Sequence, residues 1–393
     1  CIAILLGLCA VAAAQMAPMH NVGVDNVITD SYLVGLKPGA AGLSMSTLNA
    51  GVQVLKVFEI NAWRALHVNA DSVALLALRK DPSVDYVEVD AWTAHYDCND
   101  QDSGEAVWGL TRSSSRELPT YPGSQYFWLD EEDGTGVDAY IVDTGIYLEH
   151  NDFGGRARHG MTASGISGGD NDDNGHGTHC AGTVAGTRFG VAKNAALIAV
   201  KVLNAAGSGS ASTIVEGVEW VAQQHQSAPN KKSVINMSLG ISPPSETLEA
   251  AVNAAIAAGV NTCVSARNNN RDACVDSPSR LPAAITCAAS AIDDTLPSFT
   301  NYGECVNIIA PGNAVLSCGI GSPDATSTKS GTSMSAPHTA GWVARYLSSF
   351  PEDVVPTPAE VMDALIETST KDQVNLEAPK DTTPNRLMYA ACD

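Results

Sequence analysis

With 393 residues, the chain is too long for one small domain and long enough for two, each with its own core. Apolar residues make up 45% of the sequence and charged residues 17%, which is typical of a globular protein with a large buried core. The formal net charge of −21 argues against binding to nucleic acid, which requires a basic face. We therefore expect a globular protein with no nucleic-acid partner, whose acidity favours solubility in an extracellular fluid.

The first residues are typical of a secretory signal. Residues 1–14 are almost wholly apolar and end in Ala12-Ala13-Ala14, which resembles a signal core followed by a small-residue cleavage site. This stretch is too short to span a membrane, and we find no other stretch apolar enough to do so. We expect residues 1–17 to be the remaining part of a signal. The protein is then secreted or delivered to a vacuole-like compartment, without a membrane anchor.

Residues 27–95 indicate a small α+β unit. The predicted strands cover 31–36, 52–60, 62–68 and 84–89, and the predicted helices cover 43–49 and 72–79. The last of these strands alternates apolar and polar residues, which is the period of a strand. Asp71 is a typical cap for the second helix. The polar segment 96–104, which carries several aspartates, is predicted to be a linker.

From Trp108 onward, predicted strands alternate with predicted helices. The strands cover 137–142, 196–202, 234–239 and 261–266, and the helices cover 213–224, 245–258, 339–347 and 357–367. This alternation predicts a parallel sheet that helices cover on both faces. Functional residues of such sheets gather at the carboxyl ends of the strands, and Asp143 directly follows one of them.

Three motifs supply the residue types of a nucleophilic hydrolysis. Asp143 lies in Asp-Thr-Gly, His176 in Asn-Gly-His-Gly-Thr-His at the start of a small-residue helix, and Ser333 in Gly-Thr-Ser-Met-Ser in a predicted loop. A serine hydroxyl becomes a good nucleophile only when a base takes its proton. We predict that Ser333 attacks, His176 transfers the proton, and Asp143 orients the imidazole. His179 has no accompanying metal-binding motif and is predicted to be structural.

In the order Asp, His, Ser, these motifs resemble those of the subtilisin-like serine proteases. The flanking sequences resemble the proteinase K branch of that family at 107–110, 190–193, 200–203, 298–303 and 310–312. The resemblance covers roughly residues 107–393. It implies a three-layer α/β fold around a mostly parallel central sheet. It also implies a secreted serine endopeptidase that cleaves protein or peptide substrates through an acyl-enzyme.

The same resemblance extends to the N-terminal unit. Residues 18–95 resemble the inhibitory propeptide of these proteases, whose C-terminal tail, here 89–95, lies in the cleft as a bound product. Residues 96–393 would then be the catalytic domain, released by cleavage between Ala94 and Gln101. We expect a zymogen inhibited by its own propeptide, and a monomeric enzyme. The alternative is that residues 18–95 are an unrelated N-terminal module.

The resemblance also implies two donors for the oxyanion, namely the side-chain amide of Asn268 and the backbone N–H of Ser333. The sequence departs from the family here, because Arg267 replaces a glycine in the wall of the primary specificity pocket. The arginine can point to solvent, or it can narrow the pocket and favour a small or acidic residue before the scissile bond. It can also displace Asn268, which would lower turnover about 10²–10³-fold. The sequence leaves these three outcomes open.

Substrate is expected to bind as an added strand between two backbone edges. By resemblance, these edges are Gly207-Ser208-Gly209 and Ser238-Leu239-Gly240, and Ala266 and Arg267 border the specificity pocket. Glycines allow the substrate backbone to approach closely. The family usually has another glycine after the second edge, whereas this chain has Ile241.

The resemblance implies a structural calcium site at the carbonyl groups of Pro282 and Ala284 and the side chain of residue 307. This chain has Asn307 where relatives have an acid, and loss of a hard anionic ligand predicts weak calcium binding. We expect that no cofactor is required. The acidic run 170–174 is predicted to be a solvated loop rather than a calcium site.

Of the ten cysteines, Cys1 and Cys9 leave with the signal, so eight enter an oxidising route. By resemblance, Cys274 and Cys305 form a disulfide, and Cys180 is a buried free thiol beside the catalytic histidine. Cys263 and Cys287 lie in apolar, strand-like runs that suit free thiols. The sequence assigns no partner to the remaining cysteines, which are Cys98, Cys318 and Cys392.

A second hypothesis keeps the fold but not the chemistry. In it the protein only binds peptides, because Arg267 has disrupted the oxyanion site. The complete set of Asp143, His176 and Ser333 favours the protease. Covalent labelling of Ser333 by a fluorophosphonate probe distinguishes the two hypotheses.

Overall fold

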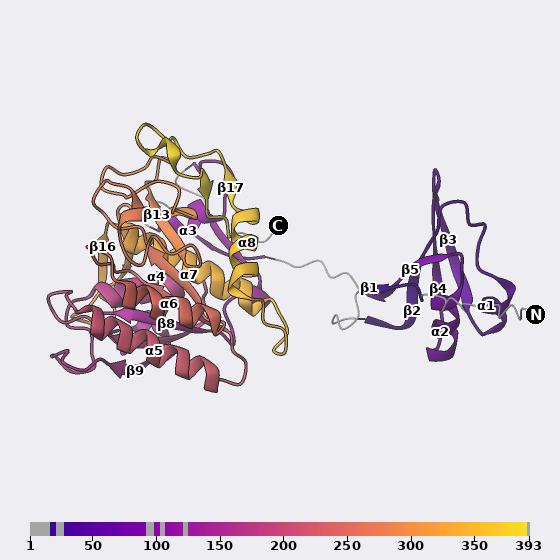
Figure 1. Ribbon diagram of the computed structural model, residues 1–393, viewed down its shortest axis with the longest axis horizontal. Coiled ribbons are helices and arrows are strands. Elements are labelled where there is room, and N and C mark those ends of the chain that lie inside the picture. The colour runs from indigo at the N-terminus through magenta and orange to yellow at the C-terminus, as the bar shows by residue number, and fades with distance from the viewer. Residues whose placement is uncertain (1–15, 21–26, 92–97, 103–106, 121–124, 391–393) are drawn as a thin grey trace, which may run out of the picture. The chain divides into compact units, whose positions relative to one another are not determined.

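The computed structural model describes residues 16–20, 27–91, 98–102, 107–120 and 125–390. The chain divides into two compact units, residues 1–96 and 97–393 (Figure 1). Residues 1–15 of the expected signal, residues 92–95 of the expected tail and Cys392 lie outside the described residues. Within the described ranges, no helix is long and apolar enough to cross a membrane.

The first unit is a small α+β domain, as predicted. Its described strands pair in the order β1-β5-β2-β4-β3, with β1 parallel to β5 and the other pairs antiparallel. The elements are β1 (Met19–His20), β2 (Val27–Leu36), α1 (Met45–Asn49), β3 (Gln53–Ile60), β4 (Trp63–Asn69), α2 (Ser72–Lys80) and β5 (Val84–Ala91). Asp71 caps α2 by accepting from the N–H groups of Val73 and Ala74. Ala17, which we had placed at the end of the signal, is buried in the core of this unit.

The second unit contains a sheet of nine described strands in the order β17-β18-β14-β13-β12-β11-β8-β10-β9, parallel except for the pair β17/β18. Its strands are β8 (Asp138–Asp143), β9 (Ala157–Thr162), β10 (Ala196–Lys201), β11 (Ser233–Met237), β12 (Asn261–Ser265), β13 (Ile285–Ser290), β14 (Ile308–Pro311), β17 (Thr370–Lys371) and β18 (Arg386–Leu387). The α-helices are α3 (Trp108–Ser113), α4 (His176–Ala185), α5 (Ala211–Ser227), α6 (Glu246–Ala257), α7 (Thr332–Ser348) and α8 (Pro358–Thr368).

Helices cover both faces of this sheet, and β8 shows how the sequence produces the three layers. Ala139 and Ile141 pack in a core shared with α4 and α7, whereas Tyr140 and Val142 pack in a core shared with α5 and α6. Successive side chains of a strand point to opposite faces, so an apolar run is buried on both sides. The predicted α/β fold with a mostly parallel sheet is confirmed.

Two predicted segments differ from the observed secondary structure. The segment 96–104 is not simply a linker, because Asn99–Asp102 forms strand β6, antiparallel to β7 (Gln125–Trp128). Ser333 does not lie in a loop, because α7 begins at Thr332, earlier than the predicted start at residue 339. The helix contains Pro337. Because a proline near a glycine-rich segment usually interrupts a helix, the sequence predicted a loop here.

The described cysteines are mostly buried. Cys274 and Cys305 are joined by a disulfide, as the resemblance implied, and Cys98 is also disulfide-bonded. The free and buried thiols are Cys180, Cys263, Cys287 and Cys318.

Candidate active site

The ends of three secondary-structure elements bring the three predicted residues together. Asp143 is the last residue of β8, His176 is the first residue of α4, and Ser333 lies in the first turn of α7. The turn after β8 packs closely against α4 and the segment before it. A side chain at Gly177 would come within 2.1 Å of the Gly145 carbonyl oxygen, and one at Gly145, whose φ is +106°, within 3.1 Å of the Asp172 backbone nitrogen. Glycine at both positions therefore lets the histidine approach the end of the strand.

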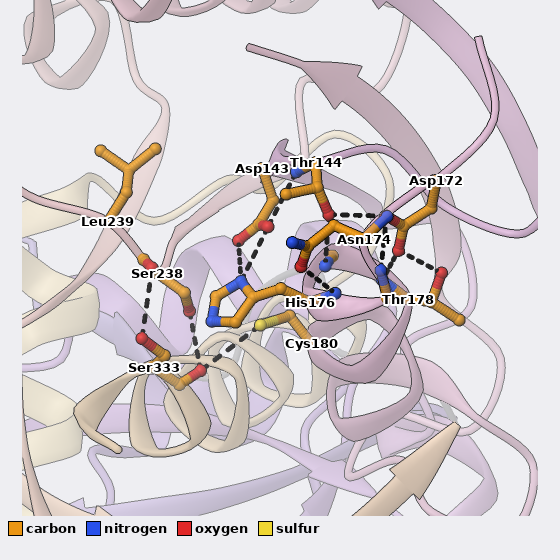
Figure 2. Close-up of polar contacts among 12 residues, drawn as sticks. Asp143, Thr144, Asp172, Asn174, His176, Thr178, Cys180, Ser238, Leu239 and Ser333 are labelled. Atoms are coloured by element: carbon orange, nitrogen blue, oxygen red, sulfur yellow. Dashed lines mark hydrogen bonds and ion pairs between the residues drawn. The ribbon is translucent and has the colours of Figure 1, made fainter. Parts of the chain in front are cut away.

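Asp143 and His176 form a hydrogen-bonded pair. The Nδ1 atom of His176 lies 2.8 Å and 2.9 Å from the two carboxylate oxygens of Asp143, whose side chain is fully buried (Figure 2). Burial disfavours a charged imidazole, but the charge and hydrogen bonds of Asp143 outweigh it and raise the pKa of His176 above its ordinary value. The carboxylate thus orients the imidazole and prepares it to carry a proton.

Asp172 holds the segment that carries His176, and sequence reasoning missed it. Its carboxylate accepts from the Thr178 hydroxyl at 2.6 Å, the Gly175 N–H at 2.8 Å and the Thr144 hydroxyl at 2.8 Å (Figure 2). Burial alone would raise the pKa of Asp172, but these hydrogen bonds lower it by more. The pKa of Asp172 therefore lies below its ordinary value. The carboxylate also lies at the N-terminus of α4, where the helix dipole favours a negative charge.

We had predicted that the acidic run 170–174 is a solvated loop. That prediction was wrong for Asp172 and Asp173. Asp172 is 6% exposed, and Asp173 accepts from the buried ammonium group of Lys201 at 2.8 Å. A signal for this role is present in the sequence, since an acid just before a helix is a typical capping residue. The run of acidic and amide residues obscured that signal.

The hydroxyl group of Ser333 donates to the carbonyl oxygen of Ser238 at 3.3 Å rather than to His176 (Figure 2). The backbone carbonyl of Ser333 accepts from the Ser238 hydroxyl at 2.8 Å and the Cys180 thiol at 3.4 Å. This carbonyl is available because Pro337, four residues on, has no N–H to bond it within the helix. In active sites without bound substrate, the hydrogen bond between nucleophile and base is often long or absent, and it forms when substrate binds.

Two hydrogen-bond donors face the region next to Ser333. The side-chain oxygen of Asn268 accepts from the N–H and the hydroxyl of Thr332 at 2.8 Å and 3.1 Å, which leaves the Asn268 amide nitrogen to donate elsewhere. The N–H of Ser333 lies in the first turn of α7, where backbone donors lack partners within the helix. Both donors, together with the positive end of the helix dipole, suit a developing oxyanion.

The Arg267 side chain is held by a buried acid and does not point freely into solvent. Its side chain is 24% exposed, and Nη1 lies 3.4 Å from a carboxylate oxygen of the buried Asp276. Its backbone has a φ of +77°, a left-handed conformation that favours glycine.

The two predicted substrate edges border one cavity of about 370 Å³ beside His176. Its lining includes Gly207, Ser208 and Gly209 on one side and Ser238, Leu239 and Gly240 on the other. Beyond Gly240, the N–H and carbonyl of Ile241 already pair with Ser277, at 2.8 Å and 3.2 Å. The backbone of the second edge is therefore available only up to Gly240. Ala266, the last residue before Arg267, is fully buried.

The side chain of Asn307, the residue predicted to weaken a calcium site, already has partners within the protein. The side-chain oxygen of Asn307 accepts from the Thr286 N–H at 2.8 Å, and its amide nitrogen faces the Met362 sulfur at 3.8 Å. The oxygen is thus already used by the backbone, and a thioether is a poor ligand for a hard cation. Calcium bound here would have the carbonyl groups of Pro282 and Ala284 as ligands but no carboxylate from position 307.

Two further groups near the site are neutral at physiological pH. His179 bonds to the Val315 carbonyl at 3.0 Å, and burial lowers the pKa of His179 to about 3. Burial raises the pKa of the Cys180 thiol well above its ordinary value. One cluster of metal-ligating types among the described residues lies within 4.8 Å, namely Asp143, His176 and Cys180. It coincides with the hydrogen-bonded pair, so a metal there would compete with proton transfer.

Comparisons with known proteins agree with this geometry. Residues 134–387 match the family model described as "Subtilase family". The chain is 39% identical to "Cerevisin" of Saccharomyces cerevisiae over 96% of this chain, and it spans 60% of that protein's length. It is 44% identical to "Subtilisin-like serine protease Pen ch 18" of Penicillium rubens, with 95% of this chain and 83% of the relative covered.

A bacterial relative and a solved structure extend the likeness. The chain is 39% identical to the "Extracellular serine proteinase" of a Thermus species, over 96% of this chain and 93% of the relative. It is 40% identical to a protein in the "Crystal structure of a cold adapted subtilisin-like serine proteinase", with a TM-score of 0.64. That match covers 73% of this chain and 99% of the solved chain. This chain therefore belongs to the subtilase family of serine proteases.

Proposed function

We propose that this protein is a secreted serine endopeptidase, made as a zymogen, with Asp143, His176 and Ser333 as its catalytic residues. The observation that carries the proposal is the buried carboxylate–imidazole pair beside a serine at the N-terminus of α7. A subtilase relative that is named an extracellular proteinase supports a site of action outside the cell.

In the proposed reaction, the Ser333 oxygen forms a bond to the carbonyl carbon of the substrate while His176 takes the hydroxyl proton at Nε2. The negative charge then on the carbonyl oxygen is stabilised by the Ser333 N–H and the Asn268 amide. The carbon–nitrogen bond breaks, and the leaving amine takes the proton from His176. Water repeats the sequence, with His176 again as the base, and releases the acid from Ser333.

We further propose that the substrate lies as an extended strand between the edges 207–209 and 238–240. Main-chain hydrogen bonds to both edges would hold the scissile carbonyl at the two oxyanion donors. The pairing of Ile241 with Ser277 supports a short second edge that ends at Gly240. Because its N–H and carbonyl are both bonded to Ser277, Ile241 would take no part in main-chain binding of substrate.

The first unit is proposed to be the inhibitory propeptide. It forms a compact domain of its own, and the relatives' matches over 95–96% of the chain extend into it. Its sheet exposes apolar side chains, with Val57 50%, Ile60 66% and Trp63 47% exposed. An exposed apolar patch of this kind is typical of a surface that binds a partner, as an inhibitory propeptide would need.

The proposal is tested with the full chain and a Ser333→Ala variant. We expect the wild-type chain to shorten by self-cleavage near residues 94–101 and then to react with a fluorophosphonate probe at Ser333. The variant should keep its first unit and take no label. Active wild-type enzyme added to the variant provides the control, since it should cleave the same junction. A wild-type chain that does not shorten by itself, and that takes no label after another protease has removed its first unit, would instead support a peptide-binding protein.

A further inference from the structure

A charged cluster lies directly beside the proposed oxyanion site. The carboxylate of Asp276 is fully buried and pairs with two guanidinium groups. Arg271 approaches it at 2.6 Å and 3.3 Å, whereas Arg267 approaches at 3.4 Å through Nη1 alone. Two positive charges thus share one negative charge, and the more weakly bound guanidinium is that of Arg267.

The position of Arg267 is defined on two sides. Its chain neighbour Asn268 offers an oxyanion donor, and its own N–H donates to the Thr332 hydroxyl at 3.0 Å, which anchors it next to Ser333. Its side-chain stem crosses the second substrate edge. A Cβ atom added to Gly240 would come within 2.9 Å of Cδ and 3.1 Å of Cγ of Arg267.

A bound substrate would place one particular side chain against this arginine. The scissile carbonyl has to lie at the donors of Ser333 and Asn268, and the residue that contributes it pairs with the edge that ends at Gly240. The side chain of that residue therefore enters the space between Gly240 and the Asn268 segment. Arg267 occupies part of this space with its stem, since Cδ and Cγ lie against Gly240, and Asp276 holds its guanidinium through Nη1 alone.

We propose that Arg267 determines the residue before the scissile bond, excluding large apolar side chains by its bulk and favouring Glu or Asp by its charge. This inference rests on the proposed protease function. Asp276 cannot neutralise both arginines, and the remaining guanidinium N–H groups of Arg267 suit a carboxylate. A glycine at this position, which the backbone φ of +77° favours, would have neither effect.

The test compares peptides that differ only at the residue before the scissile bond, which is Glu, Gln or Phe. For the mature wild-type enzyme, we expect kcat/KM for Glu to exceed that for Gln about tenfold, the effect of one partly buried charge-assisted hydrogen bond. Phe should be the poorest of the three. Raising the salt concentration should reduce the ratio of Glu to Gln.

Two substitutions separate charge from bulk. Arg267→Met keeps the stem but not the charge, so the ratio of Glu to Gln should fall to about one while Phe stays poor. Arg267→Gly removes both, and Phe should then be cleaved best. Arg280→Gln is the control, because Arg280 pairs with Glu249 and should leave all ratios unchanged. Equal cleavage of the Glu and Gln peptides by the wild type, or an unchanged ratio in Arg267→Met, would overturn the proposal.

A binding measurement separates this inference from the proposed function. Product peptides that end in Glu or Gln are titrated against Ser333→Ala with its first unit removed by added wild-type enzyme, and fluorescence anisotropy gives their affinities. Tighter binding of the Glu peptide, lost in the double variant with Arg267→Met, supports the pocket even if no catalysis occurs. Labelling of Ser333 without any preference in binding refutes the pocket and leaves the protease function standing.

Discussion

A single residue, Asp143, sets the protonation of the proposed base. Its buried carboxylate raises the pKa of His176, and an imidazole must be neutral to accept the proton of Ser333. Activity should therefore be lost as the pH falls through this raised pKa, and be regained above it. The sign follows from the charge, since protonated His176 is stabilised by the carboxylate but cannot act as a base.

Asp143→Asn should separate these two effects. The pKa of His176 should fall, which moves the acidic limb of the pH profile to lower pH, while kcat falls about 10⁴-fold because the amide favours the wrong tautomer. The measurement is kcat/KM against pH for the matured enzyme. Asp170→Asn removes a 68% exposed acid that faces His159 and should leave the profile unchanged. An acidic limb that stays in place in Asp143→Asn would contradict this account.

At the scale of elements, the junction between Gly331 and α7 positions several parts of the site at once. Gly331 has φ 154° and ψ 162° and forms the N-cap of α7, so it sets the direction in which the helix leaves the preceding strand. That conformation is one in which glycine is strongly favoured. An added Cβ would lie 3.1 Å from the amide nitrogen of Asn268.

Gly331→Ala should therefore lower kcat and change KM less, because Asn268 has to move from the oxyanion position. We expect kcat to fall by a factor approaching 10². Gly321→Ala is the matched control. Gly321 also has a positive φ, of +105°, but an added Cβ meets nothing within 4 Å. Both variants should lose about 1–3 kcal/mol of stability from backbone strain, and only Gly331→Ala should lose turnover. Equal kinetic losses would show that strain alone explains the effect.

At the scale of the catalytic unit, a buried ion pair joins distant parts of the chain. Arg112 of α3 is fully buried and contacts both carboxylate oxygens of Asp294, at 2.6 Å and 2.9 Å. The pair links the start of the unit to the segment after β13. A buried pair of this kind is hydrogen-bonded at both ends, so removal of one partner leaves an uncompensated charge.

Arg112→Met should lower the free energy of unfolding of the matured enzyme by about 3–5 kcal/mol. Arg158→Met is the control, since Arg158 is 54% exposed and lies 3.8 Å from Asp138. Its loss should cost no more than about 1 kcal/mol. Denaturant unfolding of the Ser333→Ala background, which avoids self-digestion, measures both. Similar costs for the two variants would mean that burial of Arg112 does not carry the predicted penalty.

Much of the fold was predictable because its signals are local. Apolar runs and periods placed β8, β10, α5 and α6 within a few residues, and Asp71 indicated the start of α2. The start of α7 was not predictable, because Pro337 and the glycine-rich segment before it normally interrupt helices. There the carbonyl that Pro337 leaves free is satisfied by Ser238 and Cys180, which lie far away in sequence.

The sequence by itself determined the alternation of strands and helices and the three motifs with Asp143, His176 and Ser333, because periodicity and motif chemistry depend on neighbouring residues. Only the tertiary structure decided which polar groups are buried and what they bond. In the folded protein, Asp172 accepts hydrogen bonds at the N-terminus of α4, and Arg267 pairs with Asp276. The Asn307 side-chain oxygen accepts from the Thr286 N–H. The physical reason is that the cost of burying a charge or an amide depends on partners that only folding brings into reach.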